Sequence, residues 1–146
     1  MRGLGSLGHR SSIFIGLDGL TGSLRNRDSF TDVKVGDPSF DRQFKVGGSD
    51  ADVVRGVFAD EAVRAAVRDV FGAMTVLRCA VEGEHLVVEI LPNHFSAGTA
   101  RRRLALVRRL AEALDAASGT LALPHPAEAR GSASAQSGSP VGVRIV

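Results

Sequence analysis

Two segments in which apolar and polar residues alternate, joined by a glycine-containing turn, restrict the fold of this chain more than any other feature of its sequence. The first runs from Thr75 to Val81, the second runs from Leu86 to Ile90, and Glu82-Gly83-Glu84 lies between them. Alternation places one set of side chains on one face of a strand, and a short glycine turn joins antiparallel neighbours. The pattern predicts a β-hairpin. Its inner face is expected to carry Thr75, Leu77, Cys79 and Val81 from one strand and Leu86, Val88 and Ile90 from the other.

Three earlier segments show the same alternation and are expected to be strands: residues 12–17, 31–35 and 40–46. The second is followed by Gly36-Asp37-Pro38-Ser39, a sequence typical of a turn, because proline disfavours the helical conformation at the residue before it. One face of the third strand is expected to present Phe40, Arg42, Phe44 and Val46.

Two helices are expected between these strands and the hairpin. Ser49 is the predicted N-cap of the first, with Asp52 three residues later as in a capping box. The second is expected from about Asp60 to Phe71, where apolar residues recur at helical spacing, and Gly72 is its predicted C-cap. A third and longer helix is expected from about Ala97 to Ala117, ending at Ser118-Gly119.

This order of elements predicts an α+β fold, in which a small antiparallel sheet is packed on one face by two to three helices. The length of 146 residues suits one domain, expected over residues 12–117, after a flexible N-terminus at residues 1–11. Residues 118–146 are rich in Ser, Ala, Gly and Pro and predict a flexible tail, although residues 141–146 could add an edge strand. The predicted interior brings together Phe40, Phe44, Val63, Val67, Leu86, Val88, Leu104 and Leu110.

The formal net charge is only +2, which does not imply a nucleic-acid partner, but the charges are unevenly distributed. Residues 49–95 carry four positive and eight negative charges, whereas residues 96–146 carry seven positive and three negative charges. The basic last third is expected to meet either the acidic middle of its own fold or an acidic partner or membrane surface.

The last predicted helix is amphipathic, with its basic residues gathered on one arc: Arg101, Arg102, Arg108 and Arg109. Arginine near the start of a helix opposes the macrodipole, so contact with another part of the chain or with an outside anion is expected to offset that cost. These four residues are the candidate partner-binding surface. Anionic-lipid or nucleic-acid binding is the alternative, although no aromatic stacking platform or recognised motif accompanies the basic arc.

Asp37, Asp41 and His94 are the candidates for a small enzyme or a metal site. The simpler interpretation is that Asp37 organises the turn before Pro38 and Asp41 helps to start a strand. Cys79, His85 and His94 do not have the spacing of zinc ligands, and the sequence has no phosphate-binding glycine loop. No catalytic residue, metal ligand or cofactor is therefore expected.

Residues 35–58 contain a Gly-Asp-Pro-x-Phe-Asp-x-x-Phe-x-Val block followed by a Ser-Asp helix start. This block resembles one found in a family of uncharacterised bacterial proteins whose domains often lie beside transmembrane segments. The resemblance implies a membrane-proximal bacterial domain without an assigned activity. No apolar run here approaches the roughly 18–20 residues of a membrane span. The chain as written is therefore expected to be cytoplasmic, or membrane-associated if the true gene start lies upstream.

Together these patterns predict a non-catalytic domain of unknown function that mediates protein contacts, at a bacterial membrane surface if the resemblance holds. The partner and the oligomeric state do not follow from the sequence.

Overall fold

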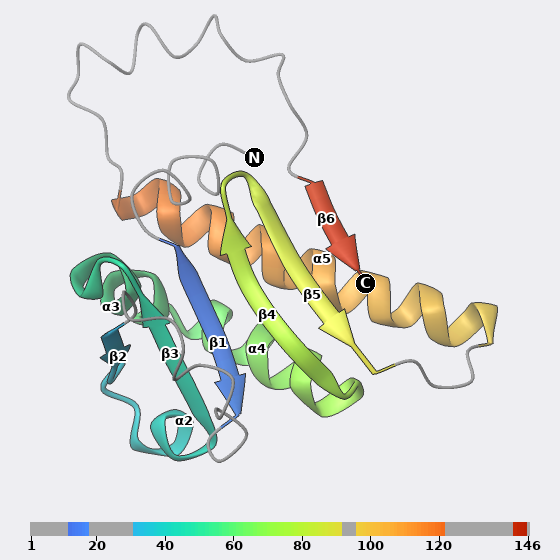
Figure 1. Cartoon of the computed structure of the whole chain (residues 1–146), viewed down its shortest axis with the longest axis horizontal. Helices are drawn as coiled ribbons and strands as arrows, with labels where there is room; N and C mark the ends of the chain where they lie inside the picture. The colour runs from blue at the N-terminus through green and yellow to red at the C-terminus, as the bar shows by residue number, and fades with distance from the viewer. Residues whose placement is uncertain (1–11, 18–30, 92–95, 122–141, 146) are drawn as a thin grey trace, which may run out of the picture.

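The computed structural model describes residues 12–17, 31–91, 96–121 and 142–145 of the chain (Figure 1). Its strands are β1 (Ile13–Leu17), β2 (Thr31–Val33), β3 (Phe44–Gly48), β4 (Val76–Glu82), β5 (His85–Ile90) and β6 (Gly142–Ile145). Its helices are α2 (Pro38–Gln43), α3 (Ala51–Phe58), α4 (Glu61–Ala73) and α5 (Ala97–Leu121).

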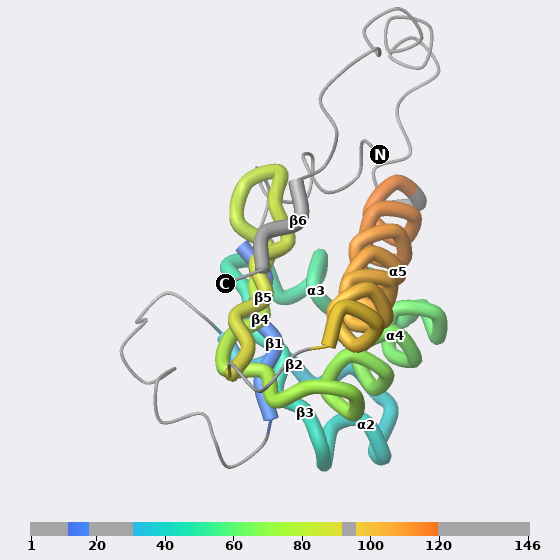
Figure 2. The backbone as a smooth tube through the Cα atoms, turned by 90° about the vertical axis from the view of Figure 1, so that its right-hand side faces the viewer, coloured from blue at the N-terminus to red at the C-terminus, as the bar shows by residue number. Residues whose placement is uncertain are grey.

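The strands form one sheet in the order β2-β3-β1-β4-β5-β6. Neighbouring strands from β2 to β5 are antiparallel, and β6 runs parallel to β5. Helices α3, α4 and α5 lie on the same side of the sheet, and α5 packs against both α3 and α4 (Figure 2). The predicted α+β class, with an antiparallel sheet covered on one face by helices, is confirmed.

The hydrophobic core lies between the sheet and these helices. Alternation along the strands directs one set of side chains inward, so that Ile15 of β1, Cys79 of β4 and Val88 of β5 are all buried. Seven of the eight residues expected in the interior belong to this core. Leu104 is the exception, because 38% of its surface is exposed and the first buried residue of α5 is Val107.

The segment expected to be a strand from residue 40 to residue 46 is a helix followed by a strand. Asp37 caps α2 by accepting hydrogen bonds from the backbone N–H groups of Ser39 and Phe40, and Pro38 occupies the first turn. Phe40 and Phe44 are four residues apart, a spacing that puts two side chains on one face in a helix and in a strand alike. Both are buried with ring centroids 4.8 Å apart, so the alternation prediction was wrong for residues 40–43 and correct from Phe44 onward.

Two predicted helix caps differ in the structure. Asp50, and not Ser49, is the N-cap of α3, because its carboxylate accepts from the N–H groups of Asp52 and Val53. The Ser49 hydroxyl instead accepts from the N–H of Ser12 beside β1. Gly72 is not a C-cap, since α4 continues to Ala73 and ends at Met74.

The β4–β5 hairpin forms at the predicted turn, where Gly83 has a φ of +60°. Its inner face differs at one end, because the pairing register shifts between Val76 and Arg78. Val76 is therefore buried, while Thr75 is exposed and Leu77 is 61% exposed. The prediction that Thr75 and Leu77 face inward was wrong, and that for Cys79 was correct.

The last helix is longer than expected, since α5 continues through Ser118-Gly119 to Leu121. Ser118 is buried and its hydroxyl donates to the carbonyl of Leu114, which satisfies the polar group inside the helix. Part of the expected tail is also ordered into β6. The flexible segments expected at residues 1–11 and 122–141 lie outside the described residues. Within the described ranges, no helix combines the length and apolarity that a membrane crossing requires.

Two glycines offer a matched test of this backbone. Ala at Gly83 is expected to lower the free energy of unfolding by about 1 kcal/mol, because a Cβ is strained at positive φ. Ala at Gly72 is expected to raise it by about 0.5 kcal/mol, because this glycine is helical and a Cβ there meets no atom within 4 Å. Urea denaturation of both variants measures the two changes. Destabilisation by Gly72→Ala would contradict the helical assignment and favour the left-handed C-cap.

Candidate functional site

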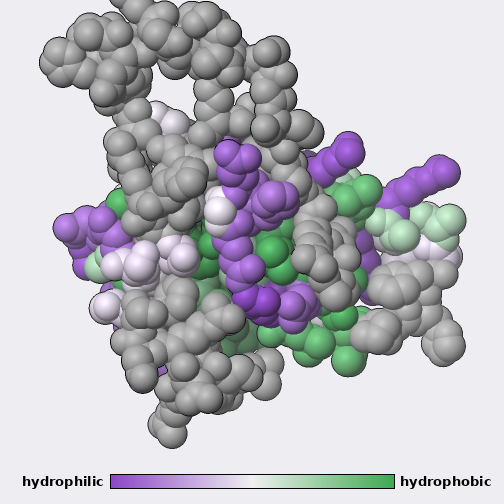
Figure 3. All heavy atoms as spheres, turned by 45° about the horizontal axis from the view of Figure 1, so that its top comes forward, coloured by the Kyte–Doolittle hydropathy of each residue, from purple (hydrophilic) through white to green (hydrophobic). Residues whose placement is uncertain are grey.

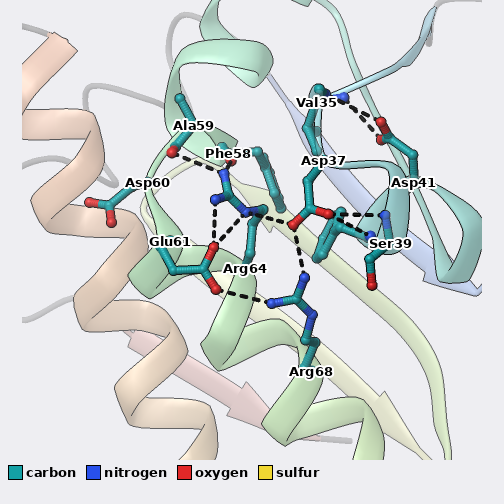
Figure 4. Close-up of polar contacts among 12 residues, drawn as sticks. Val35, Asp37, Ser39, Asp41, Phe58, Ala59, Asp60, Glu61, Arg64 and Arg68 are labelled. Atoms are coloured by element: carbon teal, nitrogen blue, oxygen red, sulfur yellow. Dashed lines mark hydrogen bonds and ion pairs between the residues drawn. The ribbon is translucent and has the colours of Figure 1, made fainter.

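The most connected polar group in the described chain is the cluster of Asp37, Glu61, Arg64 and Arg68, called here the Asp37 cluster (Figure 4). Asp37 lies before α2, and the other three residues lie on one face of α4 at spacings of three and four. The Asp37 Oδ2 atom lies 2.9 Å from Arg68 Nη2 and 3.3 Å from Arg64 Nε. Glu61 contacts both guanidinium groups through its two carboxylate oxygens. Two positive and two negative charges therefore balance within the cluster.

Arg64 also joins the cluster to α3. Its Nη1 atom donates to the carbonyl oxygens of Phe58 and Ala59, at 2.8 and 2.9 Å, where α3 ends. These carbonyls have no partner within the helix, and a cationic donor suits the negative end of the helix dipole. Only 16% of the Arg64 side chain is exposed, so its position is fixed by packing as well as by charge.

Asp41 stabilises the turn that precedes Asp37. Its two oxygens accept from the backbone N–H groups of Val35 and Gly36, at 3.0 and 3.2 Å. Gly36 has a φ of +88°, a conformation that favours glycine. The Gly-Asp-Pro-x-Phe-Asp block is thereby explained as a glycine turn, an N-cap, a first-turn proline, a core phenylalanine and a carboxylate that closes the turn.

The structure thus brings together two of the three residues considered for catalysis or metal binding. Asp37 and Asp41 lie one helical turn apart, and the backbone N–H of Asp41 donates to the carbonyl of Asp37. His94 lies outside the described residues. Within the ranges that the structure describes, no group of three or more His, Cys, Asp or Glu side chains is arranged to hold a metal ion.

The local bonds lower the pKa of Asp37 below its ordinary value of 3.8. The largest cause is the hydrogen bond from the backbone N–H of Phe40, and desolvation by burial opposes it. Arg68 and the N–H of Ser39 lower the pKa further. A carboxylate held in its charged form by these three hydrogen bonds is a poor proton acceptor, so this geometry favours the structural interpretation of Asp37.

Cys79 and His85 lie in different surroundings, one buried and the other exposed. Cys79 is fully buried among the core residues, and burial raises the pKa of its thiol to about 12. His85 is exposed at the first position of β5, opposite Glu82. A thiolate nucleophile requires an accessible thiol with a lowered pKa, and the surroundings of Cys79 have the opposite effect.

The four arginines of the candidate partner-binding surface are all exposed on α5: Arg101, Arg102, Arg108 and Arg109. Arg109 Nη1 lies 3.6 Å from Asp69 Oδ2 on α4, which provides one link between the basic helix and the acidic middle of the chain. Among the described residues, neither Arg101 nor Arg102 makes an ion pair. The basic surface therefore extends beyond the acidic residues that its own fold supplies.

The first part of α5, Ala97–Leu106, is called here the α5 arm. It projects past the end of the sheet, and hydrophilic side chains protrude at this end of the molecule (Figures 1 and 3). None of its ten residues is buried, whereas Val107, Leu110, Ala111 and Leu114 are fully buried further along the helix. The structure thus divides α5 into a half with fully buried residues and a basic half with none, in which Leu106 is partly buried against the core. The regular amphipathic pattern did not indicate this division.

The contribution of Glu61, Arg64 and Arg68 to the Asp37 cluster was missed in the sequence. Their spacing of three and four with alternating sign is a recognisable signal for ion pairs along one helix. Their partner Asp37 is 31 residues away from Arg68, however, and no local pattern indicates that contact.

Comparison of the chain with protein-family models, with curated proteins and with solved structures finds no match. The resemblance of residues 35–58 to membrane-proximal bacterial domains therefore stays a prediction.

Substitutions at Asp37 are expected to separate its two roles. Asp37→Ala removes the N-cap of α2 and the shared partner of two arginines, so it should lower the free energy of unfolding most. Asp37→Asn keeps a capping oxygen but removes the charge, so its loss should be smaller. Asp52→Asn is the control, because this exposed ion pair with Arg55 is expected to change stability by no more than about 0.5 kcal/mol. Equal losses for all three variants in urea denaturation would contradict a structural role for the cluster.

The Asp37 cluster is also expected to make stability depend on pH. Because the pKa of Asp37 is lower in the folded chain, its contribution is complete above its ordinary value of 3.8 and is lost as pH falls through the folded-state pKa. The stability difference between wild type and Asp37→Asn should therefore be constant near neutral pH and shrink at strongly acidic pH. A difference that stays constant across the whole range would contradict the lowered pKa.

The Cys79 thiol is expected to be protected in the native chain. Its modification by a thiol reagent at neutral pH should be slow until urea unfolds the chain, because the group is both buried and protonated. A Leu77→Cys variant supplies the control, since this neighbouring position is 61% exposed and its thiol should react at once. Equal rates for the two thiols in native chains would contradict the burial of Cys79.

Proposed function

We propose that this chain is a non-catalytic domain that acts through contacts with an acidic protein partner, and that the α5 arm is the contact surface. The observation that carries the proposal is the contrast along α5: ten unburied residues with exposed arginines precede a half that is packed into the core.

An arm of this kind has two unfavourable features when it is alone in water. Its side chains bury little surface, so tertiary packing stabilises this end of α5 less than the half that follows Leu106. Arg101 and Arg102 also lie near the positive end of the helix dipole, and the first turn of α5 has no acidic residue to offset them. An acidic surface laid along the arm would bury part of it and neutralise these charges, so both features support a partner at this place.

The chemistry of the arm favours protein over lipid or nucleic acid. Leu104 and Leu106 are two residues apart and therefore lie on opposite sides of the helix, about 200° from each other. The arm thus lacks the broad apolar face with which a helix inserts into a membrane interface. The sequence of Ala97–Leu106 also contains no aromatic residue on which a base could stack.

Support for a non-catalytic role comes from the residues considered for chemistry. Asp37 and Asp41 hold backbone N–H groups and arginines in place, and Cys79 is buried with a raised pKa. Asp37 and Asp41 would have to lose these contacts in order to react, and Cys79 would have to become exposed.

A photocrosslinking amino acid in the full chain tests the proposal. It is placed at Ala100 in the arm or at Ala73, which is also an exposed alanine in a helix but lies on α4. In extracts of cells that express the chain, Ala100 should yield a discrete adduct with a protein, and Ala73 should not. Arg101→Glu should reduce the Ala100 adduct about tenfold or more, since reversing a charge within an interface costs at least 1.4 kcal/mol. Arg55→Glu, an exposed reversal on α3, should leave it unchanged.

Three outcomes would overturn the proposal. The first is the absence of any adduct at Ala100, and the second is equal labelling at Ala73. The third is salt-sensitive binding of the arm to phosphatidylglycerol vesicles or to RNA with no protein adduct, which would reassign the basic surface to anionic lipid or nucleic acid.

A further inference from the structure

The edge of the sheet at β5 is closed by the C-terminal segment of the chain. β6 pairs with β5 in parallel, with Gly142, Val143, Arg144 and Ile145 opposite His85, Leu86, Val87 and Val88. β6 lies at the outer edge of the sheet, beyond β5 (Figure 1). It has one strand neighbour, whereas β5 has two.

The pairing places two β-branched residues of β6 opposite two apolar residues of β5. Val143 and Ile145 lie in register with Leu86 and Val88, whose side chains are fully buried in the core. A shift of one residue would bring Arg144 into register with Leu86 or Val88, so the sequence of β6 favours the observed register. The β5 edge is therefore suited to an extended parallel segment with β-branched residues at alternate positions.

The connection to β6 is long relative to the helix that precedes it. Residues 122–141 separate the end of α5 from β6. A chain of 20 residues can span up to about 66–72 Å, whereas the 25 residues of α5 are only about 38 Å long. The same β6 can therefore reach the β5 edge of its own copy or that of an adjacent copy.

We propose that the β5 edge is an exchangeable strand-binding site, and that its second occupant is the C-terminal segment of another copy of this chain. The same backbone pairs form within one copy and between two copies, so reciprocal exchange changes only the entropy of the connection. A connection of this length gives an effective concentration on the order of 1 mM, so the monomer prevails in dilute solution and the exchanged dimer accumulates near that concentration.

A peptide of residues 139–146 tests the strand-binding site directly. Val143→Pro in the full chain removes an N–H and the regular pairing of β6, and it should leave the β5 edge open. This variant should bind the labelled peptide with a Kd of about 10–100 µM. In wild type, β6 has an effective concentration of about 1 mM, and a Kd in this range would keep the β5 edge mostly paired with it. Wild type should bind the peptide about tenfold or more weakly, because its own β6 occupies the edge. The same peptide with proline at position 143 is the control and should not bind.

The mass of the wild-type chain provides a measurement that needs no variant. Light scattering should show a monomer at about 10 µM and a growing dimer fraction toward about 1 mM. Val143→Pro should remain monomeric, since it has no competent strand to donate. Failure of a folded Val143→Pro chain to bind the peptide would overturn the site. A wild type that stays monomeric at the highest concentration, or a dimer that persists in Val143→Pro, would overturn strand exchange.

Discussion

The carboxylate of Asp37 is the interaction on which the arrangement of the first half of the fold depends. It accepts from the backbone N–H groups of Ser39 and Phe40 and contacts the guanidinium groups of Arg64 and Arg68. One side chain therefore starts α2 and fixes α2 against α4. Arg68 in turn lies 5.6 Å from the ring of Phe40, which is fully buried. Loss of the carboxylate would leave Glu61 as the one acidic partner of Arg64 and Arg68 among the described residues, and it would loosen the helix that holds Phe40 in the core.

The same interactions determine which residues are left for function. The acidic side chains most suggestive of chemistry are engaged in holding the turn, the N-cap and α4 together. Two other features of the described residues are suited to contacts. These are the α5 arm, which begins before the packed part of its helix, and the β5 edge, which pairs with β6. Both features suit binding, one through charge and the other through backbone pairing.

The sequence correctly predicted those segments in which the spacing of apolar residues fits a single type of secondary structure. The hairpin turn at Gly83 and the inward position of Cys79 are of this kind. The spacing of four between Phe40 and Phe44 is shared by helix and strand, and only the capping bond of Asp37 decides between them. The register shift that exposes Leu77 depends on how β4 pairs with its neighbours. The Asp37 cluster could not be predicted because it joins residues about 30 positions apart, whereas the arginine arc could be, since it lies within one helix.

The distribution of charge along α5 supports the proposed position of an acidic partner. The acidic residue of α4 that α5 reaches is Asp69, and its partner Arg109 is well inside the packed half of the helix. This pair is exposed and its atoms are 3.6 Å apart, so it contributes little to stability. Arg101 and Arg102 lie about two turns nearer the start of α5, beyond the part of the helix that is packed into the core. The positive charge of these two exposed residues is therefore not balanced by an ion pair within the described part of the fold, and an acidic surface outside the fold would complement it.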